Sequence, residues 1–174
     1  MSTRLKSLGL ILVLVVGAFV VVGAQAPDAK LTGQLKRLFP NAASFSAKQN
    51  DPPHYKALGP GNTTMGYAFW TTELTPLERG YDGPIKILVG VDTKGVLTGI
   101  VVAEHKEPYG DFSVDTPAFQ SQFRNKDIRD QFRVGGDIDA ISRATISVTT
   151  AARSVRNGAR RLARALITPP GNTE

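Results

Sequence analysis

Two β-rich runs separated by a short turn place the strongest constraint on the fold of this chain. They are "PIKILVGVD" (84–92) and "VLTGIVVAEH" (96–105), and "DTKG" (92–95) joins them. Apolar residues alternate along the first run, as in a strand with one buried face. Two such runs around a short Asp/Gly turn are typical of a β-hairpin. We therefore expect two adjacent antiparallel strands over residues 84–105.

A long amphipathic helix is predicted near the C-terminus. Its apolar residues recur at alternating spacings of four and three, and they are Val148, Ala152, Val155, Ala159, Leu162 and Leu166. This spacing gives one narrow apolar stripe on a helix. A neighbouring face carries Arg153, Arg156, Arg160 and Arg164. We interpret the arginines from Arg156 onward as a solvated face.

The remaining elements are shorter. Leucines at helical spacing predict a helix over 31–38 that stops at Pro40, and "TPAFQSQFRN" predicts a second short helix capped by Thr116. Pro, Gly and Asn make residues 50–62 a predicted loop, and aromatic and β-branched residues predict a strand over 66–74. The pattern as a whole predicts an α+β fold, with a mixed, mostly antiparallel sheet packed by a few helices.

The first 26 residues are typical of an export signal or a membrane anchor. Arg4 and Lys6 precede an apolar run from Leu8 to Gly23, and "AQA" (24–26) follows it. A charged start, an apolar run and a small-x-small site are the parts of a cleavable signal. The run is also almost long enough to cross a bilayer as an uncleaved helix. Both alternatives send the rest of the chain to the extracytoplasmic side, either anchored to the membrane or secreted.

Composition excludes several kinds of site. The chain has no Cys and only two His, His54 and His105, so disulfides, thiolate catalysis, cysteine-bound metals and histidine-rich metal sites are not expected. Any redox chemistry then needs an organic cofactor. The leader holds two of the 21 basic residues and none of the 15 acidic ones, which leaves an excess of four positive charges. No nucleic-acid motif accompanies this modest excess, so we expect no nucleic-acid partner.

A cluster of hydroxyl side chains precedes the long helix. "DAISRATISVTT" (139–150) places them at Ser142, Thr145, Ser147, Thr149 and Thr150. Ser and Thr at a helix N-terminus are ordinarily caps, and most such clusters do nothing more. The same position also favours a phosphate, because free backbone N–H groups and the helix dipole attract an anion. Pattern alone leaves these two interpretations open.

Several motifs, in order, resemble one family. "DAISRAT" (139–145) resembles the Asp-x-x-Ser/Thr-Gly-Ala-Thr signature of proteins that carry FMN on the final threonine. "GYAFWTTEL" (66–74), residues 80–108 and "FQSQF" (119–123) are similar to the FMN-binding domain of the nitrous-oxide-reductase regulator NosR. The G and C subunits of Rnf and sodium-pumping NADH:quinone reductase complexes share this domain. "EHKEPYG" (104–110) is closest to the NosR type.

The resemblance implies roles for six residues. Thr145 would be the attachment site, through a phosphoester to FMN, and a separate magnesium-dependent flavin transferase would install the group from FAD. The other signature positions, read mainly by that transferase, are Asp139, Ser142 and Ala144. His105 and Glu107 would stand at the mouth of the flavin site, although a strand-end histidine and a loop carboxylate are often purely structural. The aromatic residues that could flank the flavin are Tyr67, Trp70, Tyr109 and Phe112.

The chain departs from the signature at Arg143, which replaces the usual glycine. Glycine commonly sits where the backbone takes a positive φ, and an arginine is compatible if the conformation there is ordinary. The arginine side chain could then either contact the phosphate or hinder the transferase. Two hypotheses follow. The first is an exported, membrane-associated electron-transfer flavoprotein that relays electrons between a membrane oxidoreductase and an extracytoplasmic acceptor, without catalytic residues or a metal site of its own. The second is a regulatory or scaffold module that has lost its flavin.

These hypotheses share one division of the chain. Residues 1–26 are the leader, and 27–62 are a lead-in helix and loop. Residues 63–168 are the predicted FMN-binding domain, and 169–174 are a tail.

Overall fold

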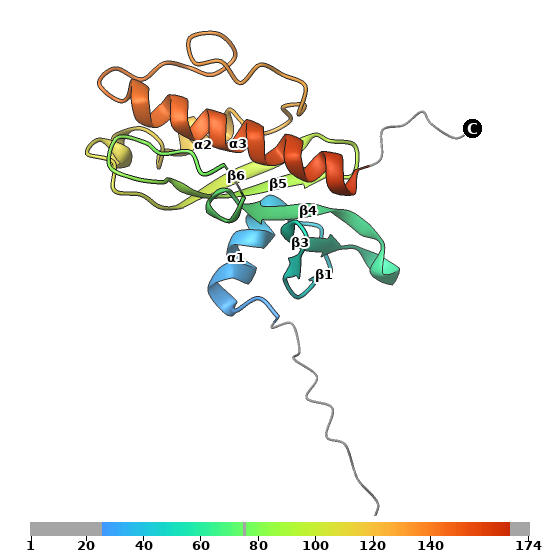
Figure 1. The fold of residues 1–174 in the computed structure, drawn as a ribbon. Coiled ribbons are helices and arrows are strands. Elements are labelled where there is room, and N and C mark those ends of the chain that lie inside the picture. The colour runs from blue at the N-terminus through green and yellow to red at the C-terminus, as the bar shows by residue number, and fades with distance from the viewer. Residues whose placement is uncertain (1–25, 75, 168–174) are drawn as a thin grey trace, which may run out of the picture.

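The fold is described by a computed structural model that covers residues 26–74 and 76–167 (Figure 1). The predicted leader lies outside the described residues except for Ala26, and so does the predicted tail. Within the described ranges, every helix is too short or too polar to cross a membrane.

One antiparallel sheet forms the centre of the protein, and its strands follow the order β1-β3-β4-β5-β6. A two-residue strand, β2, pairs with β3 beside this path. The bounds are β1 Ser44–Phe45, β2 Gln49–Asn50, β3 Pro53–Leu58, β4 Thr64–Trp70, β5 Lys86–Asp92 and β6 Leu97–Glu104. Three helices pack around the sheet, which confirms the predicted α+β class. They are α1 Ala29–Leu38, α2 Pro117–Ser121 and α3 Thr145–Leu166.

The predicted hairpin is confirmed as β5 and β6. Val89 pairs with Ile100, and a bulge after Gly90 adjusts the register toward the turn. In the turn, the Asp92 carboxylate accepts hydrogen bonds from the amides of Lys94 (2.8 Å) and Val96 (2.9 Å). Side chains that bond to their own turn are a main reason why Asp is favoured there.

Each face of the sheet has its own hydrophobic core. On one face, Ile87 and Val89 pack with α3, whose predicted apolar stripe is buried in this core. On the other face, Leu88 and Val101 pack with residues of α1. Successive side chains of β5 alternate between these cores because a strand has a period of two. Figure 1 shows α3 and α1 on opposite sides of the sheet.

The predicted loop over residues 50–62 is wrong in its middle. Residues 53–58 form β3, which pairs with β4. Turns flank this strand, at residues 51–52 and at Pro60–Asn62, which form a short 3₁₀ helix. Tyr55 and Ala57 are buried in the core beside α1. Burial of these side chains in a sheet outweighs the turn propensity of the neighbouring Pro and Gly residues.

The other short elements are largely as predicted. The strand expected over 66–74 begins earlier, at Thr64, and ends at Trp70, where a 3₁₀ helix (Thr71–Glu73) follows. The hydroxyl of Thr116 caps α2 by accepting from the amide of Phe119. After α2, the chain runs along the outer side of α3 before entering it, as Figure 1 shows. This course places residues 124–144 against the same helix that they precede.

Candidate functional site

The first residue of α3 is Thr145, and its N-cap is Ala144, which has no side-chain oxygen. Of the two interpretations left open for the hydroxyl cluster, the Ser/Thr cap is not found, because no side chain caps this helix at Ala144. The first helical bond runs from the amide of Val148 to the carbonyl of Ala144 (2.9 Å). The amides of Thr145, Ile146 and Ser147 accordingly lack a helical acceptor. Together with the helix dipole, these free N–H groups make the start of α3 attractive to an anion.

Thr145 itself is exposed, as are Ser142 and Arg143, whereas Ala144 is buried. Arg143 has a φ of 66°, so it lies in the left-handed region that favours glycine. The backbone of Arg143 therefore does not have the ordinary conformation that arginine residues usually adopt. A left-handed conformation costs an L-residue about 1–2 kcal/mol. The backbone thus keeps the shape for which glycine is suited, although an arginine occupies the position.

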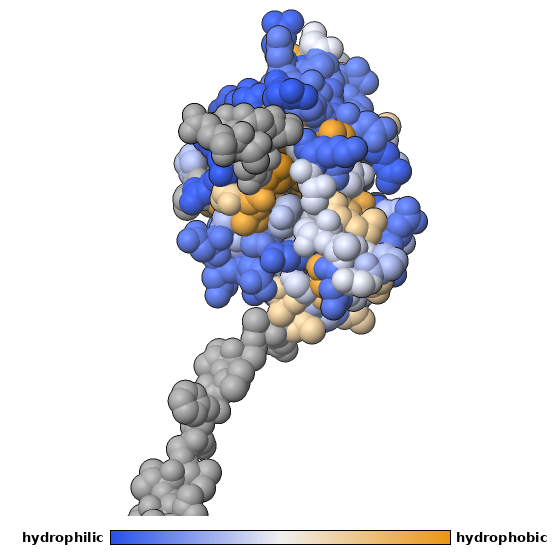
Figure 2. Space-filling model, turned by 90° about the vertical axis from the view of Figure 1, so that its right-hand side faces the viewer, coloured by the Kyte–Doolittle hydropathy of each residue, from blue (hydrophilic) through white to orange (hydrophobic). Residues whose placement is uncertain are grey.

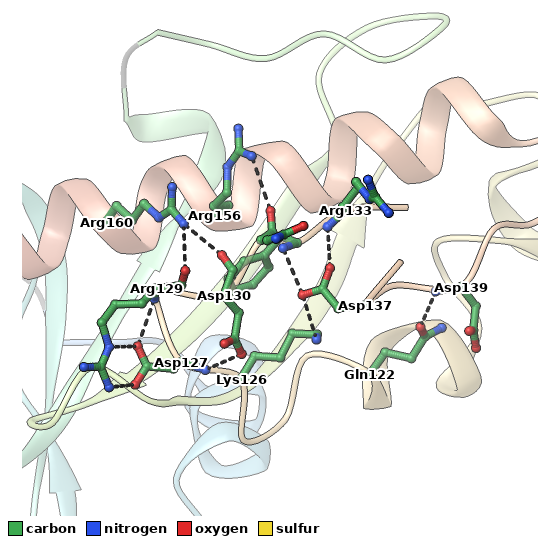
Figure 3. A network of polar contacts seen from close by, with 12 residues as sticks. Gln122, Lys126, Asp127, Arg129, Asp130, Arg133, Asp137, Asp139, Arg156 and Arg160 are labelled. Atoms are coloured by element: carbon green, nitrogen blue, oxygen red, sulfur yellow. Dashed lines mark hydrogen bonds and ion pairs between the residues drawn. The ribbon is translucent and has the colours of Figure 1, made fainter. Parts of the chain in front are cut away.

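Asp139 lies farther from the helix, at the end of the segment that follows α2. Its amide donates to the side chain of Gln122 (2.7 Å), and Figure 3 draws this contact. The residue is exposed. The backbone is thereby held near α2 while the carboxylate stays accessible from solvent.

Glu107 connects the segment after β6 to the start of α3. The residue is only 6% exposed, and its carboxylate accepts hydrogen bonds from the hydroxyl of Ser147 and from the amides of Tyr81 (2.9 Å) and Asp82 (3.1 Å). Burial alone would raise the pKa of Glu107, but these hydrogen bonds and the nearby His105 lower it below its ordinary value. A Cβ atom at Gly80 would collide with the carboxylate. Glu107 therefore ties three segments together as a buried anion.

His105 supports the same segment. Its side chain is 13% exposed, and its Nε2 atom lies 3.6 Å from a carboxylate oxygen of Asp111. The imidazole lies against Gly110, where a Cβ atom would overlap the ring. Its buried Nδ1 atom has no hydrogen-bond partner among the described residues. His105 thus packs inside its own loop, two residues from Glu107.

Large apolar side chains are exposed around this junction. Tyr81 is next to the Glu107 carboxylate, Tyr109 and Phe112 lie in the loop that follows it, and Ile146 follows Thr145. Their exposed fractions run from 50% to 80%. Exposed aromatic side chains that cluster on neighbouring segments commonly mark a binding surface. Of the aromatic candidates from the sequence, Tyr109 and Phe112 belong to this surface.

Tyr67 and Trp70 do not belong to this exposed surface. The Tyr67 hydroxyl reaches the carbonyl of Leu166 (3.5 Å), at the opposite end of α3 from Thr145. Trp70 is buried in the core beside α1, and the ammonium group of Lys86 lies 5.0 Å from its ring centre. The two aromatics are structural because alternation along β4 directs them to other surfaces.

The Thr145 hydroxyl lies at the surface, since this residue is exposed. Three cavities lie along α3 among the described residues, and the one nearest to the helix start is lined by Thr149, one turn after Thr145.

Comparison with known proteins shows which family this part of the chain resembles. Residues 80–160 match the model of the FMN-binding domain family, and this range contains Glu107, the signature segment and the start of α3. The match spans slightly less than half of the chain, so it is a likeness of this segment to an FMN-binding domain. The resemblance to FMN-binding domain proteins that was expected from the sequence is confirmed for these residues.

Two curated relatives are subunits named G of ion-translocating oxidoreductase complexes. The relative from Methanosarcina acetivorans is 30% identical over 126 residues, which cover 65% of this chain and 64% of the relative. The relative from Vibrio vulnificus is 32% identical over 88 residues, which cover 45% of this chain and 42% of the relative. In both cases the chain spans less than two thirds of the relative's length.

Sequence reasoning missed two residues of the site. Ser147 was one of a group of hydroxyls, and only the fold shows that it bonds to Glu107, 40 residues earlier. Tyr81 carried no signal, since an aromatic residue in a Gly-rich loop has no periodicity to interpret.

Proposed function

We propose that this protein is an exported, membrane-associated electron-transfer flavoprotein whose FMN is bound covalently through its phosphate to Thr145. The observation that carries the proposal is the position of the Thr145 hydroxyl, which is exposed at the uncapped first residue of α3. An ester phosphate on this oxygen would lie beside free amides and the positive end of the helix dipole. The family match to an FMN-binding domain supports this placement.

The exposure of Thr145 supports a covalent bond, because an exposed hydroxyl is accessible to an enzyme that attaches the flavin. A tethered flavin needs only local contacts to stay in place. Tyr109, Phe112 and Tyr81 are accessible for contact with an isoalloxazine ring.

Attachment requires an enzyme, because a threonine hydroxyl is a weak nucleophile. In the proposed step, the Thr145 oxygen attacks the phosphorus of the FMN half of FAD, and the pyrophosphate bond to AMP breaks. The proton goes to a base of the transferase, AMP leaves, and a phosphodiester to FMN remains. A magnesium ion in the transferase would stabilise the leaving phosphate. Asp139 and Ser142 are both exposed, and we propose that they are recognised by that enzyme.

The flavin would supply the redox chemistry, while the chain positions it. In this proposal Glu107 holds the loops of Tyr81 and Tyr109 against α3 and places a buried negative charge near the start of the helix. His105 keeps the Glu107 segment in shape through its packing against Gly110. The partner would be a membrane oxidoreductase on the extracytoplasmic side, in line with the names of the two relatives.

The regulatory or scaffold module remains the second candidate, and Arg143 is the observation that favours it. A long cationic side chain stands two residues before the attachment position, where the signature has glycine. If this side chain blocks the transferase, the same fold would persist without a flavin.

One experiment separates the two candidates. The protein is produced with an active flavin transferase, and its intact mass is measured. We expect an increase of one FMN less one water, complete loss of this increase in Thr145→Ala, and no loss in Thr149→Ala one turn later. An adduct that survives in Thr145→Ala would contradict the site. An unmodified wild-type chain that becomes modified only as Arg143→Gly would support the regulatory candidate, and mapping the mature N-terminus tests the leader.

A further inference from the structure

A groove lies between α3 and the segment that runs along it, on a part of the protein that the flavin proposal does not use. Its volume is about 530 Å³. Five arginines line it, and no acidic side chain does so among the described residues. The arginines are Arg129, Arg133, Arg153, Arg156 and Arg160, and we call this feature the arginine groove.

Most of this positive charge is not neutralised. Arg160 donates to the carbonyls of Ile128 (2.7 Å) and Asp130 (2.8 Å), and Arg156 donates to the carbonyl of Gln131 (3.4 Å). Carbonyl oxygens hold a guanidinium group in place but carry no net charge, so the cation keeps its field. The predicted solvated face is therefore wrong for Arg156 and Arg160, which bind the segment that follows α2.

Ion pairs reach only two of the five arginines among the described residues. Arg129 pairs with Asp127 (2.6 Å), and Arg153 lies 3.5 Å from Glu78. Arg133 makes its hydrogen bonds through its backbone: the amide donates to Asp137, and the carbonyl accepts from the amides of Gly136 and Ile138. Figure 3 shows the Arg133 guanidinium group directed away from the Asp137 carboxylate. Three positive charges thus remain available in one groove.

The walls of the groove are held in position before any partner arrives. Asp137 accepts from the amides of Phe132 and Arg133 and also pairs with Lys126 (3.2 Å). Figure 3 shows this network beside the bonds from Arg156 and Arg160. Arginines that are already fixed lose less conformational freedom on binding, which favours recognition of a charged partner.

The spacing of the arginines favours an extended partner over a small anion. Arg153 and Arg160 are seven residues apart on α3, which separates them by about 10 Å along the helix. Their donors are directed to different acceptors and do not converge on one point. Arginine is also enriched in protein interfaces, where it pairs with carboxylates.

We propose that the arginine groove docks an acidic, extended segment of a redox partner protein. The proposal extends the electron-transfer function and rests on it for the nature of the partner. Complementary charges speed association and keep such complexes short-lived, which suits repeated electron transfer. Figure 2 shows that hydrophilic residues cover the upper part of the molecule in that view, where residues 124–144 and α3 lie.

The location of the groove favours a protein over an anionic membrane. The described chain begins below α1, on the side of the sheet opposite α3 (Figure 1). The arginine groove is thus on the opposite side of the sheet from the point where the described chain begins.

The test measures binding of a fluorescein-labelled peptide of alternating Glu and Gly by anisotropy at low salt. The groove variant is Arg133→Gln with Arg156→Gln. The control is Arg37→Gln with Arg124→Gln, which removes the same charge from exposed residues outside the groove. We expect the groove variant to bind about tenfold more weakly and the control to change by less than about twofold, as for two lost charge contacts.

Each alternative has its own outcome. Equal weakening in both double variants, or no binding by the wild type, would overturn the proposal. The proposal would also be overturned if the protein bound vesicles of equal parts phosphatidylglycerol and phosphatidylcholine more strongly than the peptide, and if this binding required the groove arginines. Arg133→Gln alone breaks no side-chain hydrogen bond of the described residues and should still weaken binding. Thr145→Ala should bind the peptide normally, so docking and flavin attachment fail independently.

Discussion

The buried contact between Glu107 and Ser147 gives the sharpest test of how this site is built. Glu107→Gln keeps the shape of the side chain but removes its charge. The carboxylate accepts three hydrogen bonds, and bonds to a charged group contribute about 1.5–3 kcal/mol each, against about 0.5–1.5 kcal/mol for neutral ones. Water can reach the amides of Tyr81 and Asp82, which are on exposed residues, so part of the loss is recovered. We expect a net loss of about 2 kcal/mol in the free energy of unfolding.

Ser147→Ala completes a double-mutant cycle with Glu107→Gln. The serine is 4% exposed, and its removal should lower the free energy of unfolding by about 1–2 kcal/mol. Because both variants break the same contact, the double variant should lose less than the sum, with a coupling of about 1 kcal/mol. Glu104→Gln is the control, since its ion pair with Lys86 is on an exposed side chain and should change stability much less.

Urea unfolding followed by circular dichroism at neutral pH measures these differences. A Glu107→Gln midpoint equal to that of the wild type would refute the buried-anion interpretation. Strictly additive single variants would show that the carboxylate and the hydroxyl do not interact in solution.

Two further predictions follow from packing and charge. The pKa of Glu107 is below its ordinary value of 4.5, so its charge stabilises the fold above that pH and loses this effect as pH falls toward the folded-state pKa. Acid titration of stability should therefore be steeper in the wild type than in Glu107→Gln, and parallel curves would contradict this. In the second prediction, Gly158→Ala should destabilise by about 1–3 kcal/mol because its Cβ would overlap the Phe69 ring. Gly33→Ala in α1 meets nothing within 4 Å and should stabilise by about 0.5–1 kcal/mol, and thermal unfolding of the pair checks both signs.

Those two glycines illustrate what a sequence can and cannot predict. Both lie inside helices, where replacement by alanine normally stabilises. The expected effects of the two substitutions differ only because α3 packs against β4: Gly158 is buried under Phe69, whereas Gly33 is exposed. The identity of the neighbouring element is not encoded in the residues next to the glycine.

In the candidate site, too, the sequence predicted some features and only the fold revealed others. The resemblance of "DAISRAT" selected Thr145, and the structure exposes this residue at the start of α3. The uncapped helix start and the left-handed Arg143 were not predicted, since both depend on how the preceding segment approaches the helix. Glu107 was selected by its motif, but its three hydrogen-bond donors come from segments distant in the chain.

The sequence by itself determined the β5–β6 hairpin and the buried stripe of α3, because alternation and helical spacing are local patterns that need no knowledge of the partner surface. Tertiary structure decided that residues 53–58 form a strand, that Glu107 meets Ser147, and that Arg156 and Arg160 bind a neighbouring segment. The physical reason is that burial and hydrogen bonding between distant segments can outweigh local propensity. Such contacts exist only after the chain has folded.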